Sequence, residues 1–208
     1  MCEYPLLTLV NSGIKDICVV VGGSKVGDFV SFLGNSREYD ANIYFRYQKE
    51  PLGIAHGISL CQDFLKDDKF AVCLGDNIFS EHFAEVVKQF HEGATIVLKE
   101  HEHPEHFGVA QLGRKANIIN IIEKPKEFIS NLVITGFYLF DQKFFDYYNY
   151  IEPSKRNEYE ITDILKQYNR DNRLGYVTYR GYWSDAGTYH SLLACNNYVA
   201  EHNEKFIK

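Results

Sequence analysis

The 208-residue sequence has little of several features that would place a protein in a specialised class. No apolar run approaches the roughly 20 residues needed to cross a bilayer, and the first residues lack the basic flank and apolar core of a signal peptide. The net charge is -6, so electrostatics gives no reason to expect binding to DNA, RNA or anionic membranes. We therefore expect a cytoplasmic protein that binds neither nucleic acid nor membrane.

Cysteine is also scarce. The five cysteines are scattered, odd in number and without a C-x-x-C pair, which argues against a disulfide framework and against a structural zinc site. The sequence has no evident linker, repeat or low-complexity tract, and its length suits one well-buried domain better than two. We predict a single domain over residues 1–208.

The first half of the chain alternates helical patterns with short apolar runs. Strands that are apolar on both faces and separated by helices are typical of a parallel sheet with right-handed crossovers. We therefore expect a Rossmann-like layer in this half. The predicted helices cover residues 4–10, 25–33 and 54–64, and the predicted strands cover residues 17–21, 43–47 and 70–74.

The pattern changes after a strand predicted at residues 94–98. Further apolar runs follow with turns between some of them, which suggests antiparallel additions to the same sheet. The fold class is therefore α/β, a three-layer αβα arrangement with a mixed, mainly parallel sheet. The later strands are predicted at residues 108–112, 118–122 and 134–140, and the later helices at 142–148, 162–168 and 188–206.

Two strand-like runs end in a lone carboxylate and a tight turn. Asp76 follows the strand at 70–74 through Gly75, and Asp185 precedes Ala186, Gly187 and Thr188. Ligands usually bind at the carboxyl edge of a parallel sheet, where two carboxylates can hold one Mg²⁺. A turn at Asp76 and a helix cap near Asp185 are the alternative interpretations, and the residues alone leave both open.

Eight short segments occur in order along the chain. They are Tyr4-Pro5-Leu6, Gln48 to His56, Leu74 to Phe79, Phe107-Gly108-Val109, Ile122 to Lys126, Thr135 to Tyr138, Glu160 to Asp163 and Trp183 to Thr188. Together they resemble the sugar-1-phosphate nucleotidyltransferase family, most closely its glucose-1-phosphate thymidylyltransferases. Any one of these segments would be a weak signal, whereas eight collinear ones covering nearly the whole chain are specific.

The resemblance implies a transferase of nucleotide-sugar and polysaccharide biosynthesis. Such an enzyme moves a nucleotidyl group from a nucleoside triphosphate, here dTTP or UTP, to a sugar-1-phosphate, here glucose-1-phosphate, and releases pyrophosphate. Its partners would be those two substrates, and Mg²⁺ would be the cofactor that bridges them. Family members are commonly dimers or tetramers, so a homo-oligomer is a further expectation.

The resemblance also assigns roles on the metal and nucleotide side. Asp76 and Asp185 match the catalytic residues that hold the metal. Gln48 and Gly53 match positions that meet the nucleobase, where the glutamine amide offers a donor and an acceptor and the glycine allows close approach.

The sugar-phosphate pocket is assigned to Gly108, Glu123 and Lys124 in the same way. Glu123 would accept hydrogen bonds from sugar hydroxyls, and Lys124 would meet the phosphate as a point charge. From composition alone, residues 123–126 would be interpreted as a solvated strand end.

The sequence departs from the family at its start. Family members begin with a strand, a Gly-Gly-x-Gly-Thr-Arg-Leu phosphate loop and a Pro-Lys pair, about thirty residues or one strand-loop-helix unit before this chain opens. The Gly22-Gly23-Ser24-Lys25 segment is only superficially similar, because it follows the second family strand and lacks the arginine. We expect a nucleotidyltransferase fold without its first strand and loop. The alternatives are a non-catalytic sugar-nucleotide-binding or regulatory relative that has lost the loop, and another nucleotide-sugar enzyme.

Overall fold

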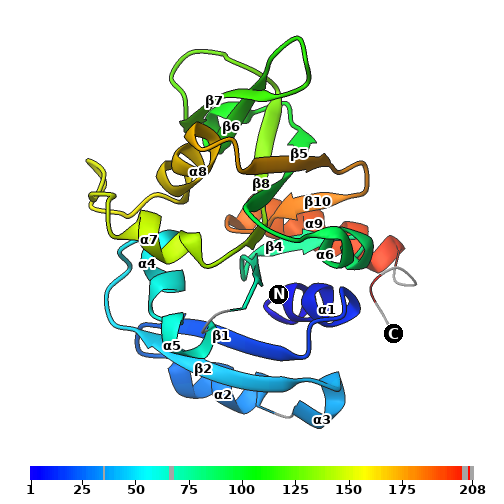
Figure 1. Ribbon diagram of the computed structural model, residues 1–208. Coiled ribbons are helices and arrows are strands. Elements are labelled where there is room, and N and C mark those ends of the chain that lie inside the picture. Colours follow the sequence, from blue (N-terminus) through cyan, green and yellow to red (C-terminus); the bar gives the residue numbers. More distant parts are fainter. Residues whose placement is uncertain (35, 66–67, 203–205, 207–208) are drawn as a thin grey trace.

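The structure is a computed structural model that describes residues 1–34, 36–65, 68–202 and 206 (Figure 1). Its helices are α1 (Glu3–Asn11), α2 (Val26–Leu33), α3 (Ser36–Tyr39), α4 (Ile54–Ser59), α5 (Gln62–Leu65), α6 (Ala84–Gln89), α7 (Lys143–Tyr148), α8 (Ile161–Arg170) and α9 (Tyr189–Glu201), with a 3-10 turn at Pro104–His106. Its strands are β1 (Asp16–Gly22), β2 (Asn42–Gln48), β3 (Phe70–Cys73), β4 (Asn77–Phe79), β5 (Ala94–Glu100), β6 (Gly108–Leu112), β7 (Ile118–Glu123), β8 (Leu132–Phe140), β9 (Leu174–Thr178) and β10 (Trp183–Asp185).

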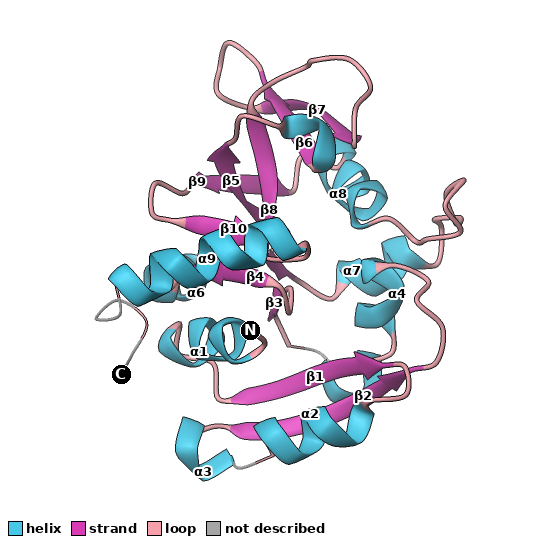
Figure 2. Ribbon diagram, turned by 180° about the vertical axis from the view of Figure 1, so that it is seen from behind, coloured by secondary structure: helices cyan, strands magenta, loops and turns pink. Residues whose placement is uncertain are grey.

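Strands β1 and β2 form a small parallel sheet of their own, in register from Asp16 with Asn42 to Gly22 with Gln48. It lies at one end of the molecule in both ribbon views, with α1 between it and the larger sheet (Figures 1 and 2). Alternate β1 residues point to opposite faces. Ile17 packs in a cluster with residues of α1 and α2, whereas Cys18 lies on the other face, toward the α4–α5 segment.

The larger sheet has the order β7-β6-β8-β5-β9, and β3 also pairs with β8. Strand β8 is buried along nearly its whole length, because α7 and α8 cover one of its faces with a cluster that contains Phe140, Phe144 and Tyr168. A separate antiparallel pair, β4 with β10, carries α9, whose Cys195 and Val199 pack beside Ile78 and Ala186.

The α/β class with a mixed sheet is confirmed, but fewer of the described strand pairs are parallel than the sequence suggested. Only β1 with β2 and β5 with β9 are parallel pairs among the described strands. The reason is that β8 runs antiparallel to β3, β5 and β6. In addition, β1 does not pair with β3, so the parallel layer expected in the first half is divided between two sheets.

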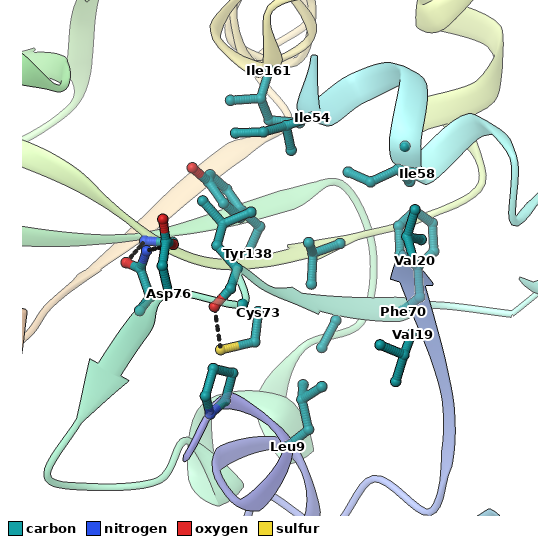
Figure 3. A pocket seen from close by; sticks show the side chains of 18 of the residues that line it. Leu9, Val19, Val20, Ile54, Ile58, Phe70, Cys73, Asp76, Tyr138 and Ile161 are labelled. Carbon is teal, nitrogen blue, oxygen red and sulfur yellow. Dashed lines mark hydrogen bonds between the residues drawn. The ribbon is translucent and has the colours of Figure 1, made fainter. Parts of the chain in front are cut away.

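Two strand edges face one cleft. Within the described part of the chain β1 pairs only with β2 and β3 only with β8, and both strands line a cleft of about 1790 Å³. Figure 3 shows Val19, Val20, Phe70 and Cys73 around this space, with Ile58 on α4 above them. Alternate backbone groups of these edges therefore point into the cleft instead of to a neighbouring strand. The expectation that the first family strand is absent stays a prediction.

Most predicted elements are found within a few residues of their expected bounds, with two notable differences. The helix predicted at 54–64 is split into α4 and α5, and the last helix ends at Glu201 instead of 206, although residues 203–205 lie outside the described part. The short elements α3, α6, β4 and β9 were not predicted, whereas β10 ends at Asp185, where a strand-like run was expected to end. None of the helices among the described residues is long and apolar enough to cross a membrane.

Candidate active site

The β4–β10 pair places Asp76 and Asp185 side by side. Asp185 ends β10 and is in register with Asn77 at the start of β4, and Asp76 directly precedes Asn77. The backbone N–H of Ala186 donates to the carbonyl oxygen of Asp76 at 2.8 Å, which extends the pairing past the strand ends. Two segments that are more than a hundred residues apart in sequence thus present their carboxylates at the same edge.

The two carboxylates also converge. A Cβ atom placed on Gly187 would lie 2.9 Å from Oδ1 of Asp185 and 3.2 Å from Oδ2 of Asp76, so these two oxygens are separated by at most the sum of those distances. Burial, and then the charge of Asp76, raise the pKa of Asp185 above its ordinary value. The pair therefore concentrates negative charge in a partly buried place.

This pair suits a hard divalent cation in its donor chemistry. Mg²⁺ is usually held by one or two carboxylates at roughly 2.0 to 2.1 Å, and it keeps several waters or substrate phosphate oxygens as its other ligands. Among the residues that the structure describes, no group of three or more His, Cys, Asp and Glu side chains could hold a metal ion. Asp76 and Asp185 would therefore be the side-chain ligands of an open site, not part of a closed protein cage.

Asn77 holds this edge together. Its side chain is 2% exposed, and Oδ1 accepts hydrogen bonds from Nε1 of Trp183 at 2.7 Å and from the backbone N–H of Gly136 at 2.8 Å. Its Nδ2 donates to Oδ1 of Asp76 at 2.9 Å. A Cβ on Gly136 would lie 2.4 Å from Cγ of Asn77, so only glycine lets β8 approach this amide. One buried amide thus connects β4, β8 and β10 and orients a candidate metal ligand.

The alternative interpretations of these two sites hold in part. Asp76 does lie in a turn, because the backbone N–H of Asn77 donates to the carbonyl of Leu74 at 3.1 Å. Thr188 does cap α9, in a reciprocal capping box with Ser191. Neither role uses the carboxylate of Asp185, whose Oδ1 accepts a hydrogen bond from the backbone N–H of Gly187 at 2.9 Å.

The two nucleotide-side residues are adjacent to each other. Nε2 of Gln48 lies 2.9 Å from Nδ1 of His56 and 3.3 Å from the carbonyl oxygen of Gly53. Gly53 is needed for a backbone reason, because its φ is +98° and a Cβ there would lie 2.7 Å from the carbonyl oxygen of Tyr159. A larger residue at 53 would therefore disturb the chain itself, so this position cannot be used as a clean test of a base pocket.

The three sugar-side residues are also brought together. Gly108 and Glu123 are a register pair of β6 and β7, and a Cβ on Gly108 would lie 3.3 Å from Oε2 of Glu123 and 3.0 Å from Thr162. Burial, and then the charge of Glu160, raise the pKa of Glu123. Lys124 is exposed with φ +43°, and its charge opposes the rise in the pKa of both Glu123 and Asp185. The ammonium group thus influences both carboxylate sites.

A guanidinium that was not among the predicted site residues lies beside Glu123. Arg156 contacts three carboxylates, with its Nη2 atom 2.7 Å from Glu160, 3.2 Å from Glu158 and 3.4 Å from Glu123. Oε1 of Glu160, the N-cap residue of α8, also accepts from the hydroxyl of Ser154 at 2.6 Å. The available signal was a single arginine two and four residues before two glutamates.

One cleft contains all of these groups. The 1790 Å³ cleft is lined by all seven residues predicted for the site, which are Gln48, Gly53, Asp76, Gly108, Glu123, Lys124 and Asp185. Arg156, Glu160, Thr162 and Tyr138 line it as well. Nucleotide, metal and sugar assignments made on separate segments therefore meet in a single space.

A family model described as "Nucleotidyl transferase" matches residues 1–202. The chain belongs to the nucleotidyltransferase family. The family resemblance inferred from the eight segments is thereby confirmed, and relatives named glucose-1-phosphate thymidylyltransferase support the interpretation of the chain as an enzyme by resemblance.

Two curated relatives illustrate the similarity within this nucleotidyltransferase family. A "Low-salt glycan biosynthesis nucleotidyltransferase Agl11" of Haloferax volcanii is 36% identical over 206 residues, which cover 96% of this chain and 57% of that protein. A glucose-1-phosphate thymidylyltransferase of Neisseria meningitidis serogroup A is 32% identical over 205 residues, covering 96% of this chain and 71% of that protein. The chain thus spans little more than half the length of the Haloferax relative.

Solved structures confirm the nucleotidyltransferase fold. A candidate glucose-1-phosphate thymidylyltransferase from Bacillus anthracis, in complex with sucrose, superimposes with a TM-score of 0.88 at 41% identity and covers 94% of this chain and 80% of that chain. A UDP-glucose pyrophosphorylase complexed with UDP-glucose has a TM-score of 0.84 at 20% identity, with 96% and 86% covered, and supports the fold alone.

Proposed function

We propose that this nucleotidyltransferase transfers a nucleotidyl group from dTTP or UTP to a sugar-1-phosphate, with glucose-1-phosphate as the first candidate, and releases pyrophosphate. The observation that carries the proposal is the single cleft that the seven assigned residues share. Relatives named as glucose-1-phosphate thymidylyltransferases support the choice of substrates.

The acidic edge would hold the cofactor. Asp76 and Asp185 would bind Mg²⁺, which, when present, neutralises charge on the phosphates and orients them. Their convergence near Gly187 and the raised pKa of Asp185 support this role, since both describe negative charge gathered at one partly buried place. Nδ2 of Asn77 would keep Asp76 oriented, because it already donates to that carboxylate.

The other walls would bind the two substrates. Gln48 would present its amide to a pyrimidine edge, since His56 and Gly53 already position that amide. Glu123 would accept from sugar hydroxyls, while Lys124 and Arg156 supply positive charge for the sugar phosphate at the same end of the cleft. The in-line attack of a phosphate oxygen needs mainly positioning and charge neutralisation, which these groups offer.

The proposal is tested on two forms of the protein. One is the 208-residue chain, and the other carries the corresponding strand and phosphate-loop unit of a relative fused before residue 1. We expect both forms to bind dTTP in the presence of Mg²⁺ and the extended form to release pyrophosphate when glucose-1-phosphate is added. In the extended form, Asp76→Asn and Asp185→Asn should each lower kcat/KM by roughly 10² to 10³, a typical effect of losing one charge-stabilising group. The exposed Asp146→Asn is the matched control and should change nothing.

The main alternative is a non-catalytic relative that only binds sugar nucleotides. Tight Mg²⁺-dependent binding by both forms, with no pyrophosphate from either at any substrate pair, would favour that alternative. Pyrophosphate release that survives both aspartate substitutions would instead show that the assigned residues are wrong. The cytoplasmic location, the homo-oligomer and the single domain stay predictions beside this proposal.

A further inference from the structure

Two cysteine sulfurs are in contact on the side of the cleft opposite the carboxylates. Cys18 lies on β1 and Cys61 lies in the turn between α4 and α5, 43 residues later, and their Sγ atoms are 3.6 Å apart. A disulfide has an S–S length of roughly 2.0 Å, so the two sulfur atoms would need to move about 1.6 Å closer together to form one. All five cysteines are free thiols, and no other pair of them forms a sulfur–sulfur contact.

The two elements that carry these thiols are already held against each other. Nη2 of Arg46, on β2 beside β1, donates to both carboxylate oxygens of Asp63 on α5, at 2.6 and 2.8 Å. The rings of Tyr44 and Phe64 meet at 5.0 Å on the same face, and Tyr44 is the register partner of Cys18. Closing the sulfur pair therefore needs no new docking of the α4–α5 segment.

The two thiols differ in reactivity. Cys61 is 4% exposed, and its thiol donates to the sulfur of Cys18, with the carbonyl oxygen of Gly57 at 3.8 Å as a weaker acceptor. That hydrogen bond is the largest cause that lowers the pKa of Cys18, and Arg46 adds to it, against burial and the charge of Asp63. The same contact and burial raise the pKa of Cys61. Cys18, which is half-buried and lines the cleft, is thus the more accessible and more nucleophilic thiol.

We propose that Cys18 and Cys61 form a reversible oxidation site for a small hydroperoxide, with Cys18 as the attacking thiol and Cys61 as the resolving one. The thiolate sulfur of Cys18 attacks one peroxide oxygen, so an S–O bond forms, the O–O bond breaks and the leaving hydroxide takes a proton to become water. The sulfur of Cys61 then attacks the Cys18 sulfenic acid, so the S–S bond forms, the S–O bond breaks and the second water leaves with the Cys61 proton. Two thiols and one hydrogen peroxide give one disulfide and two waters, and the sulfur pair is oxidised by two electrons.

The bond would couple oxidation to the nucleotide side of the cleft. It would join β1 to the segment that begins with α4, whose N-cap is Gly53, next to Gln48 at the end of β2. A cross-link that closes a loop of this length restricts the unfolded chain, so we expect the unfolding temperature to rise by roughly 5 to 15 °C. Formation of the disulfide does not depend on the proposed transfer reaction, so it can be tested without substrate.

The test exposes the reduced 208-residue protein to equimolar hydrogen peroxide, alkylates the remaining thiols and measures the mass. We expect the free-thiol count to fall from five to three, a mass decrease of two hydrogens, a cross-linked Cys18–Cys61 peptide, and full reversal by dithiothreitol. Cys61→Ser should leave a sulfenic acid on Cys18 that dimedone traps, and Cys18→Ser should abolish the rapid phase of oxidation. Cys73→Ser and Cys195→Ser are matched controls and should oxidise as the parent does.

Three results would overturn the proposal. The first is a disulfide that joins any other pair of cysteines. The second is thiol loss at the same rate in Cys18→Ser as in the parent. The third is further oxidation of Cys18 to sulfinic acid in the parent at equimolar peroxide, which would show that Cys61 does not resolve it.

Discussion

Replacing Asn77 by alanine should destabilise the protein more than any other single change at the acidic edge. The substitution leaves the backbone N–H of Gly136 and the Nε1–H of Trp183 without their acceptor, and both bonds are buried. A buried donor left unsatisfied costs about 1 to 3 kcal/mol, so the two together cost about 2 to 6 kcal/mol. Natural domains are stable by only about 5 to 15 kcal/mol, so this loss is a large fraction of the total.

The measurement is urea unfolding followed by far-UV circular dichroism at neutral pH. Asn120→Ala is the matched control, because Asn120 is an exposed residue of β7. Trp183→Phe provides an intermediate case, since it removes one donor while Asn77 keeps Gly136 as a partner. We expect the order of destabilisation to be Asn77→Ala, then Trp183→Phe, then Asn120→Ala.

A small loss of stability in Asn77→Ala would refute this reasoning. If Asn77→Ala lowered the free energy of unfolding by less than about 1 kcal/mol, the two buried donors would have found other partners. A loss equal to that of the Asn120 control would show the same. In either case Asn77 would not be the connection between β4, β8 and β10.

Three further predictions concern pH, ligand binding and the open strand edges. Burial opposes ionisation of Asp141, but hydrogen bonds from the backbone N–H of Gly93 and from Arg173 outweigh burial and lower the pKa of this carboxyl. The contribution of the ionised carboxyl to the free energy of unfolding is therefore fully present above the unfolded pKa of about 3.9 and is lost as the pH falls through the folded pKa. Asp141→Asn should cost about 1 to 3 kcal/mol in urea unfolding at pH 7 and progressively less as the pH falls below the ordinary carboxyl pKa of about 3.9, unlike the exposed control Asp146→Asn, and a cost that does not fall with pH would contradict the assignment. Gln48→Ala should weaken dTTP binding about fivefold by calorimetry, the equivalent of about 1 kcal/mol, and leave sugar-phosphate binding unchanged; a loss of both would point to general damage. Fusing a strand-forming unit before residue 1 should raise the unfolding temperature and reduce light scattering, because edges that face the cleft gain partners, and an unchanged temperature would mean that the cleft does not admit a strand.

The strong periodicities were enough to locate the main strands and most of the helices. Strand β6 was placed at its observed bounds and β1, β2, β3 and β7 to within a residue or two, because apolar runs between turns depend mainly on local sequence. The split between α4 and α5 was not predictable in this way. The break coincides with Cys61, where the chain turns onto the β1–β2 sheet through contacts with Cys18 and Arg46 that are distant in sequence.

The sequence indicated which residues to assign to the candidate site, but it did not indicate how those residues contact one another. The seven residues assigned from the eight motifs all line the cleft, and they could be found because each motif is a local pattern. The pairing of β4 with β10 was missed, because three-residue strands carry no periodicity and their register is set across the fold. Asn77 and Arg156 were missed for a related reason, as a polar side chain between distant segments leaves no trace in an apolar pattern.

Trp183, the only tryptophan of the sequence, stands two residues before Asp185. Its indole N–H is bonded to Asn77, and its ring meets those of Phe107 and His101 at 5.3 and 5.9 Å. The sequence therefore has one tryptophan fluorophore, and it stands beside Asp185 and lines the cleft. Its emission is a label-free signal for whatever enters there, free of background from tryptophans elsewhere.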